Sequence, residues 1–194
     1  RGAFALAAPY SRTVIVETHI EGHDFRVLVT GGAIAAVALR RPPRVIGDGK
    51  STLRQLVDAE NANPARGVGH ATILTRIALD EHAVSVLRDQ GFEPDSLIPA
   101  GVGIQLRGTA NLSTGGTAQD VTALLHPGTA AMCISAASRI GLDVAGIDII
   151  CEDIGRSLPE QGGAIIEVNA APGIRMHEYP STGEPRHAGD AIVE

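Results

Sequence analysis

A chain of 194 residues is long enough for one sizeable domain or two small ones. Hydrophobic residues make up 44% of it, aromatic residues only 3%, and Trp is absent. The core must therefore be built from Ala, Val, Ile and Leu, which is typical of α/β and α+β proteins. A net charge of −6 argues against general nucleic-acid binding, which usually needs a basic face.

The two cysteines, Cys133 and Cys151, form no Cys-x-x-Cys pair. We therefore expect two buried free thiols in a reducing compartment rather than a zinc ribbon or a disulfide scaffold. No run reaches the roughly 18 apolar residues of a membrane span, and no signal peptide is visible. The sequence thus predicts a cytoplasmic protein without a membrane partner. The first residue is Arg1 rather than Met, which suggests a piece of a longer protein.

The N-terminal part predicts strands joined by a tight turn. Residues 12–17 (RTVIVE) are typical of a short buried strand. Residues 25–29 and 33–40 are apolar runs separated by Thr-Gly-Gly, which indicates a β-hairpin. The Pro-Pro pair at 42–43 ends the second run.

Two helices are expected next. The first spans residues 52–60, where Thr52 and Gln55 have the spacing of a capping box. The second begins at Asp80 and stops at Gly91, a residue type favoured just past a helix end.

The clearest helix begins at Pro127 and runs to Ile140, and Gly141 stops it. Two strands follow, at 144–151 and 164–169, joined by a polar connection. Because they are close in sequence, an antiparallel pair is the economical arrangement.

Polar side chains interrupt both of these strands. Asp148 lies in the first, and Glu167 and Asn169 lie two residues apart in the second, so they share a face. An antiparallel pair can bring all three together. Two carboxylates and an amide oxygen suit a hard cation such as Mg²⁺. The alternative is that Asp148 and Glu167 form salt bridges to arginines at the sheet edge.

The segment GDGKST at 47–52 invites a P-loop interpretation, but the motif requires Gly where the chain has Arg44. We predict instead a turn before a helix. Three basic residues in or shortly before this segment either contact an anionic substrate or are solvated surface charges: Arg40, Arg41 and Lys50.

Several separated segments resemble the ATP-grasp ligases. GID at 146–148 with EVNAAPG at 167–173 resembles their metal-binding signature, and VIVETHIEGHDFRVLV at 14–29 resembles their nucleotide strand and hinge. The resemblance implies an α+β fold over residues 1–194, the C-terminal lobe of the ATP-grasp fold. Its mainly antiparallel sheet would pack against helices, with a helical, substrate-side insertion at residues 41–100.

The resemblance also implies ATP and Mg²⁺ as cofactors. Asp148, Glu167 and Asn169 would hold the Mg²⁺ ions that neutralise the ATP phosphates as the γ-phosphoryl group moves to a substrate carboxylate. Asp24 would accept hydrogen bonds from the ribose. Four residues would meet the adenine edge, mainly through their backbone: Glu17, Thr18, His19 and Ile20.

Two arginines are candidates for the reacting phosphoryl group. Arg26 would lie near the transferred phosphoryl group or the acyl-phosphate, although a surface strand cation is the alternative. Arg175 is a further candidate for stabilising this charge. His177, in the same stretch, either approaches the substrate or is structural.

The segment 100–117 is rich in Gly, Ser and Thr. Consecutive small residues can expose backbone N–H groups that form an anion-binding concavity, and a nearby Arg can clamp a carboxylate. We predict that this loop holds the carboxylate to be activated; an ordinary surface loop is the alternative. The residues concerned are Arg107, Asn111, Ser113, Thr114, Gly115 and Gly116.

Longer segments, at 40–57, 106–122 and 165–186, resemble the ATP-grasp region of the cyanophycin synthetases. N-acetylglutaminylglutamine synthetase and the bifunctional bacterial glutathione synthetases share versions of some of them. The resemblance implies a ligase that adds aspartate to the polymer backbone through an acyl-phosphate. Another ATP-grasp amide ligase, or a nucleotide-binding module without chemistry, is the alternative.

The expected partners are amino acids and peptide-like carboxylate substrates, and the full-length protein is expected to be a homo-oligomer. ATP-grasp ligases close ATP between two lobes, and the other lobe supplies lysines to the phosphates. That lobe would precede Arg1, so we expect the 194-residue piece alone to be inactive.

Overall fold

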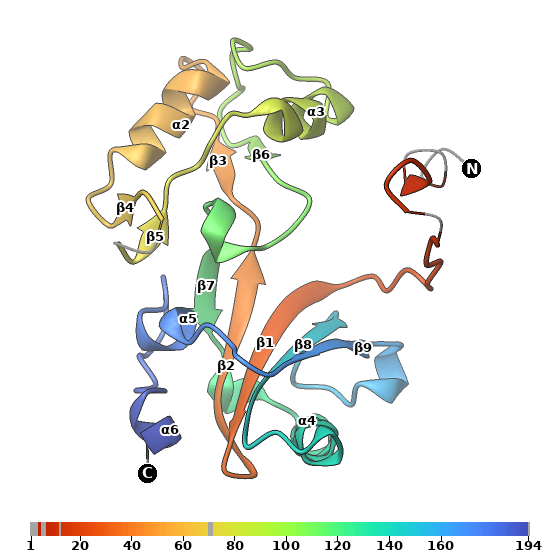
Figure 1. Cartoon of the computed structure of the whole chain (residues 1–194). Coiled ribbons are helices and arrows are strands. Elements are labelled where there is room, and N and C mark those ends of the chain that lie inside the picture. The colour runs from red at the N-terminus through yellow and green to blue at the C-terminus, as the bar shows by residue number, and fades with distance from the viewer. Residues whose placement is uncertain (1–3, 5–6, 12, 70–71, 194) are drawn as a thin grey trace.

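A five-stranded antiparallel sheet forms the centre of the computed structural model, which describes residues 4, 7–11, 13–69 and 72–193 (Figure 1). The strand order is β7-β2-β1-β8-β9, and each neighbouring pair is antiparallel. The predicted α+β class with a mainly antiparallel sheet is confirmed. The strands are β1 (His23–Thr30), β2 (Ala33–Arg41), β7 (Thr117–Asp120), β8 (Val144–Cys151) and β9 (Ala164–Asn169).

The predicted hairpin is confirmed. Gly31 and Gly32 have φ values of 54° and 75°, which only Gly adopts easily, and such a two-residue turn matches the twist of the flanking strands. The second strand ends at Arg41, directly before the Pro-Pro pair. The predicted pair at 144–151 and 164–169 is also observed with these bounds and is antiparallel.

The predicted strand at 12–17 is wrong. Arg12 lies outside the described residues, and residues 13–21 have no secondary structure. Ile15 and Val16 are 78% and 86% exposed. Apolar β-branched residues favour a strand only where a neighbouring strand and a face to cover are available. Here β1 already pairs with β2 and β8, and no described strand pairs with this segment.

One face of the sheet is apolar and covered by α4 (Pro127–Ile140), which packs across β1, β2, β8 and β9 (Figure 1). Alternate residues of the strands point to this helix, as the period of two in a strand requires. Both cysteines lie in this core as buried free thiols, as predicted. Its buried residues include Phe25, Val27, Val29, Val37, Ile147, Ile149, Cys133 and Cys151.

The opposite face is covered only in part. The short helices α5 (Arg175–Glu178) and α6 (Asp190–Val193) belong to the C-terminal segment that crosses it. This segment contributes Met176 and Ala188 to two small apolar clusters with residues of the sheet. The remaining part of the face carries charged side chains, and these form the candidate site.

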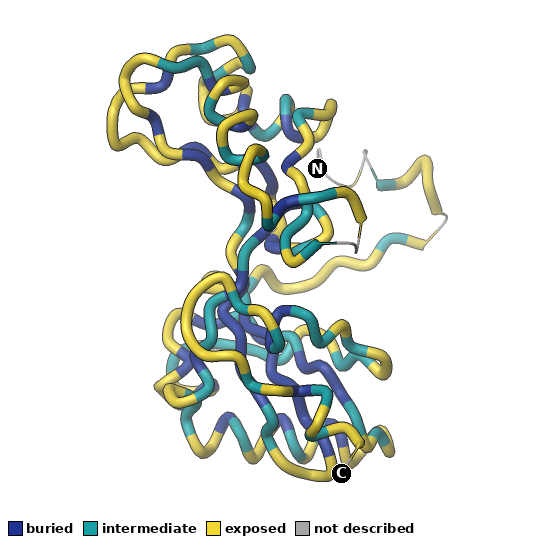
Figure 2. Tube along the Cα trace, turned by 90° about the vertical axis from the view of Figure 1, so that its left-hand side faces the viewer, coloured by how far each residue is buried: buried dark blue, intermediate teal, exposed yellow. Residues whose placement is uncertain are grey.

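A second apolar core lies above the sheet, and Figure 2 shows the two groups of buried positions joined by a narrower part. Helices α2 (Leu53–Asn61) and α3 (Glu81–Asp89) lie in the region predicted as a helical insertion, whose extent as a domain stays a prediction. Four short strands accompany them: β3 (Arg44–Ile46), β4 (Arg66–Gly67), β5 (Leu74–Thr75) and β6 (Gly103–Gln105). The core consists of Val45, Leu53, Val57, Ile77, Leu87, Ile98, Ile104 and Leu106.

The predicted helix starts are confirmed, while α2 ends one residue later than predicted, at Asn61. Thr52 and Gln55 form both hydrogen bonds of a capping box at the start of α2. The carboxylate of Asp80 accepts from the N–H of Ala83 at the start of α3. Helix α4 starts at Pro127, and its last residue is followed by Gly.

Residues 100–117 differ from the predicted polar loop. Ile104, Leu106 and Ala110 are buried, because this segment supplies β6 and returns the chain from the second core to the sheet. Three short 3₁₀ helices also escaped prediction: η1 (Leu112–Thr114), η2 (Thr122–Leu124) and η3 (Pro159–Gln161).

Among the described residues, no helix combines the length and the apolar character that crossing a membrane requires.

Gly116 gives a test of the packing between this returning segment and the sheet. A Cβ atom there would lie 2.8 Å from the carbonyl oxygen of Asn111 and 2.9 Å from that of Arg41. Because backbone cannot move aside easily, Gly116→Ala should lower the free energy of unfolding by about 1–3 kcal/mol in urea denaturation. Gly103→Ala is the control, since no atom lies within 4 Å of its Cβ position. Equal effects of the two substitutions would contradict this account.

Candidate functional site

The register of the central strands brings the three predicted metal ligands to one face. Asp148 on β8 lies opposite Glu167 on β9, and Asn169 lies opposite Gly146, two residues from Asp148. Arg26 on β1 lies opposite Asp148 from the other side. Directly opposed residues point to the same face of a sheet. Arg26, Asp148, Glu167 and Asn169 therefore share the face that α4 does not cover.

A β-bulge in β9 makes this arrangement possible. Glu167 pairs with Asp148, but Ile149 pairs with Ile165, so Ile166 is an extra residue without an opposite partner. Ile165 and Val168 both pack against the core below α4. Residues three apart cannot share a face of a regular strand, and the extra residue resets the alternation. The bulge thus directs Glu167 to the charged face.

Two arginines hold Asp148. Arg26 donates from Nε to Oδ1 and from a terminal nitrogen to Oδ2, and the second bond measures 3.0 Å. Arg40 places a terminal nitrogen 3.0 Å from Oδ2. The side chains of Asp148 and Arg26 are 13% and 11% exposed. The salt-bridge alternative is therefore observed for Asp148, where two guanidinium groups compensate a largely buried carboxylate.

The donor set still suits Mg²⁺. Glu167 is exposed, and no described residue forms an ion pair with its carboxylate. Asn169 donates from Nδ2 to the carbonyl of Gly146 (3.2 Å), so Oδ1 is the atom left for a cation. Among the described residues, no three His, Cys, Asp or Glu side chains lie close enough together to hold a metal ion. The metal-ligand role stays a prediction.

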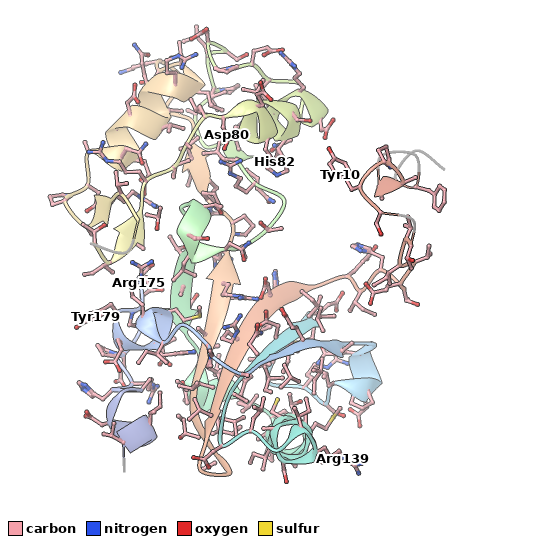
Figure 3. The ribbon with its side chains drawn as sticks, viewed as in Figure 1. Tyr10, Asp80, His82, Arg139, Arg175 and Tyr179 are labelled. Atoms are coloured by element: carbon pink, nitrogen blue, oxygen red, sulfur yellow. The ribbon has the colours of Figure 1, made fainter. Side chains whose placement is uncertain are left out.

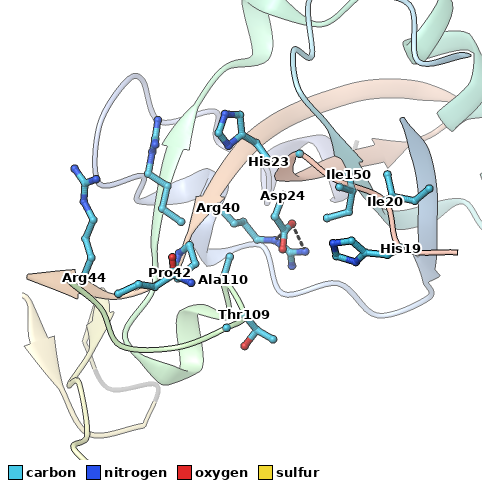
Figure 4. Close-up of a pocket in the computed structure, with 14 residues that line it drawn as sticks. His19, Ile20, His23, Asp24, Arg40, Pro42, Arg44, Thr109, Ala110 and Ile150 are labelled. Carbon is cyan, nitrogen blue, oxygen red and sulfur yellow. Dashed lines mark hydrogen bonds and ion pairs between the residues drawn. The ribbon is translucent and has the colours of Figure 1, made fainter. Parts of the chain in front are cut away.

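A cleft of about 520 Å³ opens beside this face (Figure 4). It lies between the segment that precedes β1, the end of β2 and the segment that follows β6. His19, Ile20 and Asp24 of the predicted nucleotide residues line it, whereas Glu17 and Thr18 are exposed and do not. Its other lining residues are Gly22, His23, Arg40, Arg41, Pro42, Arg44, Gln105, Gly108, Thr109, Ala110 and Ile150. With three arginines and one carboxylate, the cleft favours an anionic ligand.

Arg40 joins the cleft to the charged face. It lies opposite Asp24 across β1 and β2, and its Nε donates to the Asp24 carboxylate at 2.7 Å. Its side chain is only 8% exposed, so the interpretation of Arg40 as a solvated surface charge is wrong. Burial raises the pKa of Asp24, and the nearby Asp148 adds to this, while Arg40 opposes the rise.

The other two basic residues grouped with Arg40 are exposed: Arg41 and Lys50. The GDGKST segment is a turn before α2, as predicted. Both oxygens of the Asp48 carboxylate are used there, because Oδ1 accepts from the N–H groups of Lys50 and Ser51 and Oδ2 from the Ser51 hydroxyl. These bonds lower the pKa of Asp48 to about 2.

Arg107 lies in the second core rather than beside Asp148. Its two terminal nitrogens each donate to the Asp80 carboxylate at 2.7 Å, and its buried Nε has no partner among the described residues. The hydrogen bonds from Arg107 and from the N–H of Ala83 lower the pKa of Asp80 to about 2. Figure 3 places Asp80 at the start of α3, above the sheet. The predicted contact of Arg107 with a substrate carboxylate stays a prediction.

The predicted anion-binding concavity of free N–H groups is not formed around Gly115. The N–H groups of Thr114 and Gly116 donate to the carbonyl of Asn111, and that of Gly115 donates to the carbonyl of Leu112. These donors are satisfied within their own turn. Gly115 packs against Ile77, which explains why a side chain is not accommodated there. Contact of substrate with Asn111, Ser113 and the neighbouring residues stays a prediction.

Arg175 links the two parts of the chain. Its guanidinium donates to the backbone carbonyl of Thr72 at 2.7 Å, and Figure 3 shows the side chain extending from α5 toward β4 and β5. This contact uses one of the terminal nitrogens of Arg175. The predicted role in stabilising a phosphoryl group stays a prediction.

His177, on α5, is buried at 3% exposure, and its Nε2 has no partner among the described residues. Burial lowers the pKa of His177 to about 4, and the positive charges of Arg26 and Arg40 add to the effect against the opposing charge of Asp120. The side chain is therefore neutral near pH 7. Its sequence neighbours gave no signal of this burial, because α5 is too short for a helical pattern.

The chain is similar to known proteins along nearly its whole length. No family model matches the chain. The cyanophycin synthetase of Synechocystis sp. is 48% identical over 194 residues, which cover 99% of this chain and 22% of that protein. The cyanophycin synthetase of Geminocystis herdmanii is 47% identical over 190 residues, which cover 98% and 22%. Nearly the whole chain is homologous to one segment of the cyanophycin synthetases. The chain spans about a fifth of the length of these relatives.

The glutathione biosynthesis bifunctional protein of Clostridium perfringens is also similar, with 33% identity over 192 residues that cover 99% of this chain and 25% of that protein. A crystal structure of a bifunctional glutathione synthetase from Pasteurella multocida matches with a TM-score of 0.75 and 32% identity. The match covers 90% of this chain and 24% of that one. The predicted ATP-grasp fold is confirmed by this match.

His177 generates a prediction about stability. A base whose pKa falls from 6.5 to about 4 on folding contributes stability that is present above pH 6.5 and lost as the pH falls toward 4. The loss should reach roughly 3 kcal/mol, measured by urea denaturation at pH 7 and pH 4. In His177→Gln the loss between these pH values should be smaller by about that amount, leaving the contribution of the carboxylates. An unchanged difference between pH 7 and pH 4 in this variant would refute the prediction.

Proposed function

We propose that the full-length protein is an ATP-dependent carboxylate–amine ligase of the cyanophycin synthetase type. The observation that carries the proposal is the shared face of Asp148, Glu167 and Asn169 beside a basic cleft lined by Asp24. The similarity to cyanophycin synthetases over 99% of the chain supports the same reaction class. In the proposed reaction a substrate carboxylate attacks the γ-phosphate of ATP, and an amine then displaces phosphate from the acyl-phosphate.

Asp148, Glu167 and Asn169 would hold Mg²⁺, which when bound neutralises charge on the ATP phosphates. The donor chemistry supports this role, since two carboxylates and an amide oxygen converge on one face. Arg26 lies on the same face and would orient the transferred phosphoryl group. A guanidinium held by an ion pair is already oriented, so little reorganisation is needed when charge develops in the transition state.

The cleft would take the nucleotide. His19 and Ile20 line it from the segment before β1, and Asp24 of β1 also lines it and would accept hydrogen bonds from the ribose hydroxyls. Glu17 and Thr18 would join through their backbone, as extended segments without a pairing partner present N–H and C=O groups to a ligand. The arginines of the cleft suit the charge of the phosphates.

The carboxylate to be activated is proposed to bind at the loop that holds Arg107. The other residues proposed to contact it are Asn111, Ser113, Thr114, Gly115 and Gly116. Arg107 would reach a substrate carboxylate by exchanging its bonds to Asp80, whose side chain is 53% exposed. Arg175 is proposed to assist the reacting phosphoryl group. Addition of aspartate to a polymer backbone is the specific reaction that the cyanophycin synthetase similarity favours.

A second candidate is ligation of the kind that a glutathione synthetase performs, which the 33% identity to the Clostridium perfringens protein favours less. Incubation of the full-length protein with ATP and either aspartate with an Asp–Arg primer, or glycine with a γ-glutamyl dipeptide, separates these reactions. The proposal expects product only with the primer, detected by mass spectrometry. Product only with the dipeptide would replace the polymer reaction by the second candidate.

The metal face provides the mutational test of the proposed chemistry. In the full-length protein, Asp148→Asn and Glu167→Gln should each reduce ATP-dependent product formation by roughly a hundredfold or more, because they weaken the hold on the metal at the phosphates. Both should also weaken Mg²⁺-dependent nucleotide binding. Asp95→Asn is the matched control, since Asp95 is an exposed carboxylate paired with Arg54 in the upper part of the chain. Nucleotide binding that is independent of Mg²⁺ and unaffected by these variants would favour a binding module without chemistry.

A further inference from the structure

Arg40 is the residue that physically connects the cleft and the metal face. Its Nε lies 2.7 Å from Oδ1 of Asp24, and one terminal nitrogen lies 2.5 Å from the same oxygen and 3.0 Å from Oδ2 of Asp148. A single guanidinium thus bridges two carboxylates on two different strands. The side chain is 8% exposed, so water screens these interactions little.

We propose that Arg40 is a positioning residue that couples nucleotide binding to metal binding, by holding Asp148 until a nucleotide engages the cleft. The inference rests on the proposed function, and it assigns to Arg40 a role that a solvated surface charge would not have.

The physical reason is competition for one carboxylate. A divalent cation that approaches Asp148 alone meets the positive charges of Arg26 and Arg40 at ion-pair distance from the same oxygens. Like charges within about 5 Å repel by a few kcal/mol at the effective dielectric constant of a partly buried site. Without a nucleotide, Asp148 is therefore a poor metal ligand.

The nucleotide changes this balance in two ways. Its phosphates offer Arg40 an alternative anionic partner in the cleft, which Arg40 already lines. A ribose hydroxyl that donates to Asp24 competes with the Nε bond that anchors the guanidinium. Both effects remove the contact of Arg40 with Oδ2 of Asp148, while Arg26 keeps its bonds to this carboxylate. Linkage requires that the metal then favours the nucleotide by the same factor.

The geometry also explains why an arginine occupies this position. The planar guanidinium presents several N–H groups in a fixed fork and can therefore contact Asp24 and Asp148 at once. Asp120 at the end of β7 and Arg186 in the C-terminal segment form a comparable two-bond pair, at 2.9 and 2.5 Å, but this pair includes no predicted metal ligand. Arg186 therefore provides a matched control.

The test compares full-length wild type with Arg40→Gln, Arg40→Lys and Arg186→Gln. Binding of Mn²⁺ alone is followed by electron paramagnetic resonance, and binding of a non-hydrolysable ATP analogue is measured by calorimetry with saturating Mg²⁺ and with a chelator. Gln removes the charge but keeps hydrogen-bond donors for Asp24, which protects the fold. In Arg40→Gln, Mn²⁺ alone should bind roughly tenfold more tightly, and the gain in analogue affinity that Mg²⁺ produces should shrink by roughly tenfold.

Arg40→Lys should retain part of the coupling, because its ammonium keeps the competing charge, and Arg186→Gln should behave as wild type. A merely structural role of Arg40 would weaken both binding measurements and leave the gain from Mg²⁺ unchanged, and this result would overturn the proposal. Loss of all coupling in Arg40→Lys would overturn it as well. If the wild type binds no analogue, the proposed function itself fails. If the wild type shows the coupling and Arg40→Gln retains it in full, only the role of Arg40 is overturned.

Discussion

Four charged side chains on one face of the central sheet, two arginines and two aspartates, are the constraint on which the arrangement of this protein depends. Asp24 and Arg26 come from β1, Arg40 from β2 and Asp148 from β8. Each carboxylate contacts an arginine, so the burial of charge is compensated. This pairing is possible only because the opposite face supplies the apolar core under α4, which fixes the three strands in register.

The site forms where two separately packed regions meet. The lower core holds the charged face rigid, the upper core holds α2, α3 and the segment with Arg107, and the cleft opens between them. The contact of Arg175 with the carbonyl of Thr72 spans the two regions. The division suits a ligase of the proposed kind, in which the strands would hold nucleotide and metal and a different segment would bind the carboxylate substrate.

Elements with strong local signals could be predicted from the sequence. The turn at Gly31 and Gly32, the capping box of Thr52 and Gln55, and the helix from Pro127 depend on residues within a few positions of each other. The predicted strand at 12–17 is wrong because no described strand pairs with it, whereas β7 escaped prediction although it pairs with β2. A strand forms where a neighbour is available, and that neighbour lies far away in the chain.

Local sequence patterns were enough to predict the hairpin, helices α2, α3 and α4, the strand pair β8–β9 and the three polar residues Asp148, Glu167 and Asn169. Only the tertiary structure decided which charges meet. Counting from the turn, where Thr30 pairs with Ala33, would place Leu39 opposite Asp24, but an irregularity after Leu28 moves Arg40 there. The bulge in β9 acts similarly on Glu167. One extra residue exchanges the two faces of a strand, and its position is set by packing against the core rather than by any local pattern.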